Sequence, residues 1–186
     1  MKTLYQYLTL LASLLPLSLF SQDRPGPAAM NEDMIAWNAS RRLTWNDYKA
    51  SPDPASDAAA STTTFLTISY NISSSDFSYK IESKFSKFRS WGLYKTSYIL
   101  SHEQGHFDIA EIFARKLHKR MMEYHFDRHT YQKDLKKIYQ EILDEKAKMQ
   151  EDYDEETNHS INRDKQAEWL KKIDKMLKDY DAYADY

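Results

Sequence analysis

Cysteine is absent from this chain of 186 residues, and glycine and proline are scarce, with 3 and 5 residues respectively. The absence of cysteine excludes a disulfide framework, a thiol nucleophile and a cysteine-ligated metal site. The three glycines lie too far apart to form a phosphate-binding glycine-rich loop. An excess of positive charge is also missing, because 26 Lys and Arg stand against 28 Asp and Glu. We therefore expect no nucleic-acid partner.

An apolar run near the N-terminus, LTLLASLLPLSLF, covers residues 8–20 and follows the positive Lys2. A transmembrane helix needs about 20 apolar residues, whereas a run of this length suits the core of a signal peptide. We predict a signal peptide over residues 1–21, with cleavage after Ser21. Cleavage near Ala29 and a membrane-anchoring helix are the alternatives. The mature protein is then exported, periplasmic or secreted, and has no membrane span.

The remainder of the chain reads as a linker followed by one domain. Residues 22–32 (QDRPGPAAMNE) are polar and contain proline, which is typical of a linker, and residues 33–186 form a single domain. Residues 33–49 hold aromatic side chains in an irregular or short-strand segment. Residues 50–61 (ASPDPASDAAAS) have little to bury, so we expect a loop there.

Two segments in the first half of the domain show the alternation of a β-strand. Apolar and polar residues alternate in Thr64–Tyr70 and again in Phe77–Phe85, with many aromatic and β-branched side chains. The polar residues 71–76 (NISSSD) between them suit a hairpin turn. These two segments predict a small antiparallel sheet.

The second half of the domain has helical periodicity. Apolar residues recur at helical spacing from Tyr98 onward, again from about residue 130 to 150, and again after Asn162, which suits an N-cap. Together with the strands, this pattern predicts an α+β fold. We expect the small antiparallel sheet to pack against a zincin-like helical half.

The strongest chemical signal is the motif HExxH at His102, Glu103 and His106. Residues at positions i and i+4 lie one above the other on a helix, so both imidazoles can bind one Zn²⁺ ion. Glu103 is turned by about 100° from His102, where its carboxylate can accept a proton from a water molecule. The pattern therefore indicates a zinc site with Glu103 as the catalytic general base.

A catalytic zinc site needs a third protein ligand, and helix lengths suggest where it lies. Residues 106–125 span about 28 Å if helical, and residues 130–150 span about 30 Å. If these helices are antiparallel, the chain returns to the level of the zinc at residues 151–159 (EDYDEETNH). The best candidate there is His159. The carboxylate alternatives are Asp154, Glu155 and Glu156.

The same segments resemble a bacterial domain-of-unknown-function family that is described as predicted secreted zinc-dependent proteases. The resemblance includes WNASRRLTWNDYK, DAAAST, SHEQGHFDIAE and YDEETNHSINRDKQAEWL. Ser160 stands where the family's signature has glycine. The matching residues of that signature are Tyr153, Asp154, Thr157, His159, Gln166 and Trp169. The resemblance implies that His102, His106 and His159 bind zinc and that Glu103 is catalytic.

We therefore expect an exported zinc metallopeptidase that acts on a peptide or protein substrate. Glu103 serves as general base and then as proton donor to the leaving amine. Tyr153 is a candidate for stabilising the oxyanion, and a sheet edge could bind an extended peptide by strand addition. The alternatives are a non-catalytic exported domain with a structural zinc, and a zinc amidase that acts on cell-wall material.

Overall fold

The computed structural model describes residues 34–73 and 77–186. The predicted signal peptide and linker, and part of the predicted hairpin turn, lie outside these residues. Within the described ranges, no helix combines the length and apolarity needed to cross a bilayer.

The strands form two small antiparallel sheets. The three-stranded sheet has the order β1 (Met34–Ala36), β4 (Phe77–Ser86) and β3 (Thr64–Ile72). The two-stranded sheet pairs β2 (Ala60–Ser61) with β5 (Trp91–Gly92). Both predicted strands are confirmed as β3 and β4. The predicted loop at residues 50–61 is wrong at its end, where β2 forms.

The long hairpin of β3 and β4 presents one apolar face to the helices. Ile68 lies opposite Ile81 in the register, and the side chains of Leu66 and Ile81 are buried in the main core. Polar residues such as Lys80 alternate with them on the outer face. This alternation is the pattern that predicts the strands, and it fixes which face of the sheet meets the helices.

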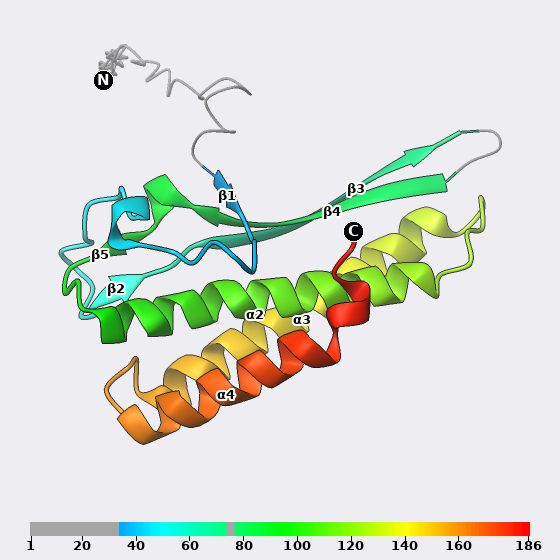
Figure 1. The fold of residues 1–186 in the computed structure, drawn as a ribbon. Coiled ribbons are helices and arrows are strands. Elements are labelled where there is room, and N and C mark those ends of the chain that lie inside the picture. The colour runs from blue at the N-terminus through cyan, green and yellow to red at the C-terminus, as the bar shows by residue number, and fades with distance from the viewer. Residues whose placement is uncertain (1–33, 74–76) are drawn as a thin grey trace, which may run out of the picture.

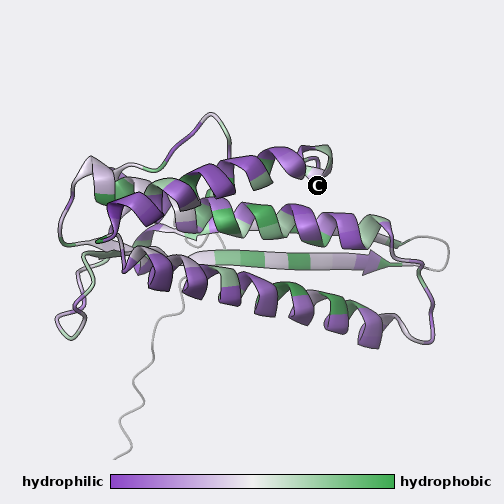
Figure 2. Cartoon of the chain, turned by 90° about the horizontal axis from the view of Figure 1, so that it is seen from below, coloured by the Kyte–Doolittle hydropathy of each residue, from purple (hydrophilic) through white to green (hydrophobic). Residues whose placement is uncertain are grey.

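Three long helices make up the second half of the chain: α2 (Ser97–Met122), α3 (Tyr131–Thr157) and α4 (Arg163–Asp179). In Figure 1, α2 runs along the hairpin, and α3 and α4 run alongside α2. Figure 2 shows hydrophilic residues along the outer faces of these helices. The α+β class is confirmed. Short 3₁₀ helices occur at Trp45–Asp47, Lys87–Arg89 and Asp181–Tyr183.

Helix α3 is longer than its sequence predicts. The apolar periodicity predicts an end near Gln150, where a run of acidic residues begins. Acidic side chains near a helix C-terminus are unfavourable, because the helix dipole is negative there. The helix instead continues to Thr157, so the prediction is wrong. Tyr153 and Thr157 are spaced by one turn and are both completely buried. Their burial against the rest of the fold outweighs the unfavourable end charges.

A tight turn joins α3 to α4. Asn158, His159 and Ser160 have positive φ angles of 47°, 49° and 72°, which reverses the chain within a few residues. Asn162 then caps α4, because its side chain accepts a hydrogen bond from the backbone N–H of Lys165 at 3.2 Å. The predicted start of the third helix is confirmed.

The central position of α2 gives a stability prediction. Leu117 is completely buried in the main core, whereas Met122, near the end of the same helix, is 61% exposed. Leu117→Ala should lower the free energy of unfolding by about 2–5 kcal/mol, because it leaves a cavity. Met122→Ala should change it by less than about 0.5 kcal/mol. Denaturant unfolding measures both. Similar losses in the two variants would contradict the central role of α2.

Candidate metal centre

A cavity of about 630 Å³ lies beside the first half of α2. The walls of the cavity come from α2, from the C-terminal half of α3, from β2 and the residues around it, and from the turn after α3. His102, Glu103 and His106 reach it from α2, and Asp154 reaches it from α3. His102, Glu103 and His106 of the HExxH motif therefore all line this cavity.

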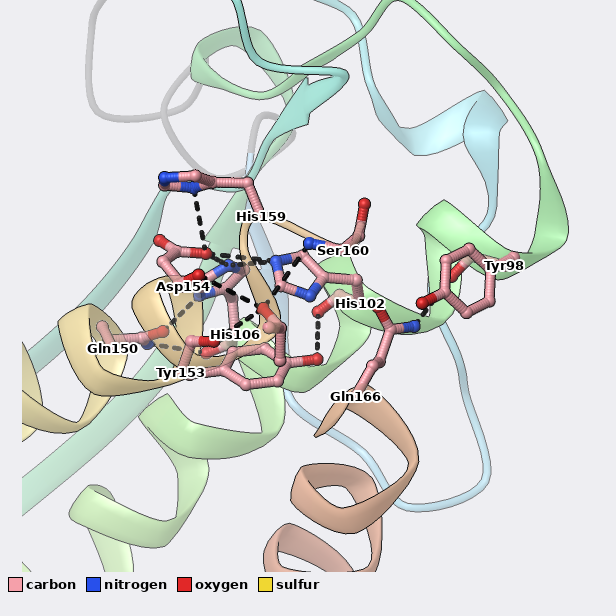
Figure 3. A network of polar contacts seen from close by, with 10 residues as sticks. Tyr98, His102, His106, Gln150, Tyr153, Asp154, His159, Ser160 and Gln166 are labelled. Carbon is pink, nitrogen blue, oxygen red and sulfur yellow. Dashed lines mark hydrogen bonds and ion pairs between the residues drawn. The ribbon is translucent and has the colours of Figure 1, made fainter. Parts of the chain in front are cut away.

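Three potential metal-ligand atoms converge in this cavity (Figure 3). The Oδ1 atom of Asp154 lies 3.1 Å from the Nε2 atom of His102 and 3.1 Å from the Nε2 atom of His106. The two Nε2 atoms are 3.2 Å apart. Ligand atoms bound to zinc at 2.0–2.1 Å in a tetrahedral arrangement lie about 3.3 Å apart. The spacing of the three atoms therefore fits a zinc ion.

The neighbours of His106 set the direction in which its ring nitrogens point. The Nδ1 atom of His106 contacts the side-chain oxygen of Gln150, and the Nε2 atom of Gln150 donates to the backbone carbonyl of His106 at 2.9 Å. A donor hydrogen on Nδ1 leaves Nε2 free as a metal ligand. Gln150 therefore acts as the positioning residue for His106.

The ring of Tyr153 packs against both imidazoles. Its ring stacks on His102 with centroids 4.4 Å apart and meets the ring of His106 edge-on at 5.1 Å. The side chain is completely buried, and its hydroxyl donates to the backbone carbonyl of His102 at 3.3 Å. The suggestion that Tyr153 stabilises an oxyanion is therefore wrong. It is a buried support for the histidines.

The pKa values of Asp154 and His106 are shifted in opposite directions. Burial by itself raises the pKa of Asp154, but hydrogen bonds from His102 and His106 outweigh it, and the net effect is a pKa well below the usual range. Burial by itself lowers the pKa of His106, but the hydrogen bond and charge of Asp154 outweigh it and raise the pKa. The carboxylate is thus held ionised against the imidazoles.

Two buried polar atoms of the motif have no hydrogen-bond partner in the described structure, Nδ1 of His102 and Oε2 of Glu103. Glu103 is only 4% exposed, yet it lines the cavity. An unpaired buried carboxylate oxygen is costly, so it calls for a partner such as water or a substrate atom. The position of Glu103 suits a proton acceptor that is not itself a metal ligand.

The four candidates for the third ligand lie in different places. Asp154 reaches both histidines. His159 lies at the rim, with its side chain 67% exposed and its Nδ1 atom 3.7 Å from Oδ1 of Asp154. Glu155 is exposed, and Glu156 accepts a hydrogen bond from the indole of Trp169 at 3.0 Å. The structure thus favours Asp154, and His159 as a ligand stays a prediction.

Sequence reasoning missed Gln150 and Lys146, which line the cavity from the same face of α3 as Asp154. The three residues follow one another at intervals of four, so recognition of the longer helix would have grouped them. Burial lowers the pKa of Lys146. No hydrogen bond or ion pair links its ammonium group to any residue in the described ranges. It adds a positive charge to the cavity.

Gly105, inside the motif, gives a test of the packing beneath the site. A Cβ atom at this position would lie 2.6 Å from the hydroxyl oxygen of Tyr153. Gly→Ala in a helix normally stabilises by about 1 kcal/mol. Gly105→Ala should instead destabilise by about 1–3 kcal/mol, because α2 and α3 must move apart. Thermal unfolding measures the change.

The control for this test is the double variant. In a Tyr153→Ala background the obstructing ring is gone, so Gly105→Ala should add little further loss of stability. Additive losses would show that the close contact of Gly105 with Tyr153 does not set the helix spacing.

The comparisons with known proteins identify a family without an assigned activity. A bacterial family described as proteins of unknown function (DUF922) matches residues 20–160, which include the HExxH motif, Asp154 and His159. Searches of the curated proteins and of the solved structures returned no match. The expectation of a bacterial family of unknown function is confirmed, whereas its description as secreted zinc-dependent proteases stays a prediction. The chain belongs to this bacterial family of unknown function.

Proposed function

We propose that this protein is an exported zinc-dependent peptidase. The observation that carries the proposal is the convergence of His102, His106 and Asp154 in a cavity that also holds the unpartnered carboxylate of Glu103. Export rests on the signal peptide predicted for residues 1–21. The zincin-like character of the fold belongs to the same proposal.

The donor set suits zinc. Imidazole nitrogen and carboxylate oxygen are both zinc ligands, and three protein ligands are typical of a catalytic site with one position left open. His102, His106 and Asp154 would hold the ion. When bound, zinc supplies Lewis acidity, which lowers the pKa of water towards about 7 and polarises a carbonyl group.

The residues of the chain then have separate tasks. Glu103 accepts the proton of the attacking water and returns it to the leaving amine, and its place in the cavity lining and its unpaired carboxylate oxygen support this role. Gln150 and Tyr153 hold the imidazoles in place. The ammonium group of Lys146 attracts negatively charged substrate atoms to the cavity.

The proposed function gives a prediction about the third zinc ligand. Asp154→Ala should weaken zinc binding strongly, because it removes an oxygen that faces both histidines. Replacing a residue that only supports a metal ligand typically costs about 10–100-fold in affinity, and the loss here should be larger. His159→Ala should cost much less, because the ring lies at the rim. Competition against a zinc indicator measures both affinities.

The exposed Glu155 provides the control, since Glu155→Ala keeps the helix and removes a neighbouring carboxylate. Its zinc affinity should equal that of the wild type. A larger loss for His159→Ala than for Asp154→Ala would restore His159 as the third ligand. If the purified protein binds no zinc, the proposed function is wrong.

A further prediction separates zinc binding from peptide hydrolysis. Glu103→Gln preserves the shape of the side chain but removes its charge and its ability to accept the proton. Zinc should still bind, whereas peptide hydrolysis should fall by at least about 10²–10⁴-fold, the usual contribution of a general base. The measurement is the cleavage rate of an unfolded protein by the zinc-loaded variant and wild type.

Two results would point to the other functions considered. Zinc binding without hydrolysis of peptides or cell-wall amides by the wild type would indicate a structural zinc. Release of fragments from cell-wall material, with no cleavage of unfolded protein, would indicate an amidase. Equal peptidase rates for Glu103→Gln and wild type would assign the activity to another site.

A further inference from the structure

A second, apolar cavity of about 840 Å³ adjoins the metal centre. Its apolar walls are formed by Tyr94, Tyr98, Ile99 and Ile161. Tyr94 is 62% exposed and Ile161 is 74% exposed, so large apolar side chains face solvent at its edges. Exposed apolar surface of this kind, next to a polar site, is typical of a binding groove.

The two cavities share part of their lining. Both are lined by His159 and Ser160 from the turn after α3, and by Ser56, Ala58 and Ala59 from the segment before β2. A ligand lying across these shared residues would therefore contact the metal centre and the apolar cavity together.

Among the strands of the described residues, β2 pairs on one side only, with β5. The carbonyl of Ala59 accepts from the N–H of Leu93 at 2.9 Å, and Ser61 lies opposite Trp91 in the register. Because backbone groups alternate along a strand, those of Ala60 point away from β5. Ala60 lines the metal cavity, as does the neighbouring Thr62. The outer edge of β2 is thus open towards the metal centre.

An extended peptide matches both features. Its backbone can hydrogen-bond to a free strand edge, while alternate side chains enter pockets beside that edge. A charged side chain would lose its hydration among the mostly apolar walls. The charged residues of the lining are Asp57 and Arg163, and the guanidinium group of Arg163 packs on the ring of Tyr98 at 4.5 Å. A large apolar side chain would instead gain from burial.

We propose that β2 and the apolar cavity form the substrate groove, which binds an extended peptide by strand addition and selects a large apolar side chain next to the metal centre. The specificity-determining residues are Tyr94, Tyr98, Ile99 and Ile161. This inference rests on the proposed peptidase function and names its substrate class.

Peptide binding, measured apart from cleavage, tests the groove. The protein is the Glu103→Gln variant with zinc, and the readout is the fluorescence anisotropy of labelled peptides of about ten residues. One Ser/Ala peptide carries a central Phe, and matched peptides carry Ala or Glu there. The Phe peptide should bind at least about tenfold more tightly than either. Methylation of alternate backbone nitrogens in the Phe peptide should cost about tenfold.

Substitutions in the groove locate the binding site. Ile161→Ser and Tyr94→Ala should each remove most of the preference for Phe over Ala, and both side chains are exposed enough to change without unfolding the protein. Met122→Ser, at a similarly exposed apolar residue far along α2, is the matched control and should keep the preference.

The outcomes separate this inference from the peptidase proposal. Phe-selective binding that depends on Ile161, in a protein whose wild type cleaves nothing, would support the groove and reject the peptidase. Cleavage by the wild type without Phe-selective binding, or with selectivity unaffected by Ile161→Ser and Tyr94→Ala, would overturn the groove. So would equal binding of the methylated and unmethylated peptides, or no binding of any peptide.

Discussion

The contact between α2 and α3 at Gly105 and Tyr153 determines the whole candidate site. Because Gly105 has no Cβ, the ring of Tyr153 can lie directly beneath the imidazoles of the motif. This contact sets how far along α2 the second helix lies. One residue later, Asp154 meets both histidines, and one turn earlier Gln150 meets His106. A single close approach thus places the third potential ligand and the positioning residue.

Polar residues on the buried face of α2 divide into two groups. Gln104 and Asp108 are fully engaged: Gln104 accepts from the backbone of Leu43 at 2.7 Å, and Asp108 accepts from Gln104 and from the indole of Trp37, each at 2.8 Å. Their bonds hold the N-terminal segment against the helix. The groups of the HExxH motif are only partly engaged: Nε2 of His102 contacts Asp154 at 3.1 Å, whereas Nδ1 of His102 and Oε2 of Glu103 have no hydrogen-bond partner among the described residues. The unpaired carboxylate oxygen of Glu103 is therefore available to accept a proton.

The sequence predicts what depends on local pattern, namely the hairpin, the motif helix and the cap of α4 at Asn162. It does not predict the end of α3, because the acidic run after Gln150 looks solvated and the burial of Tyr153 and Thr157 is tertiary. The choice among ligands follows from this. In a loop, the exposed run would offer His159, the one imidazole in it, as the natural ligand. In a helix, Asp154 is turned towards the cavity and His159 is carried to the rim.

The sequence does not predict the short strand β2 either, because its two residues, Ala60 and Ser61, carry almost no strand signal. Both residues line the cavity of the candidate metal centre, and the preceding Ala58 and Ala59 line both cavities. The turn after α3, with its three positive φ angles, contributes His159 and Ser160 to the lining of both cavities. The ligand atoms, the free strand edge and the apolar walls therefore adjoin one another because the segments between them are small or tightly turned.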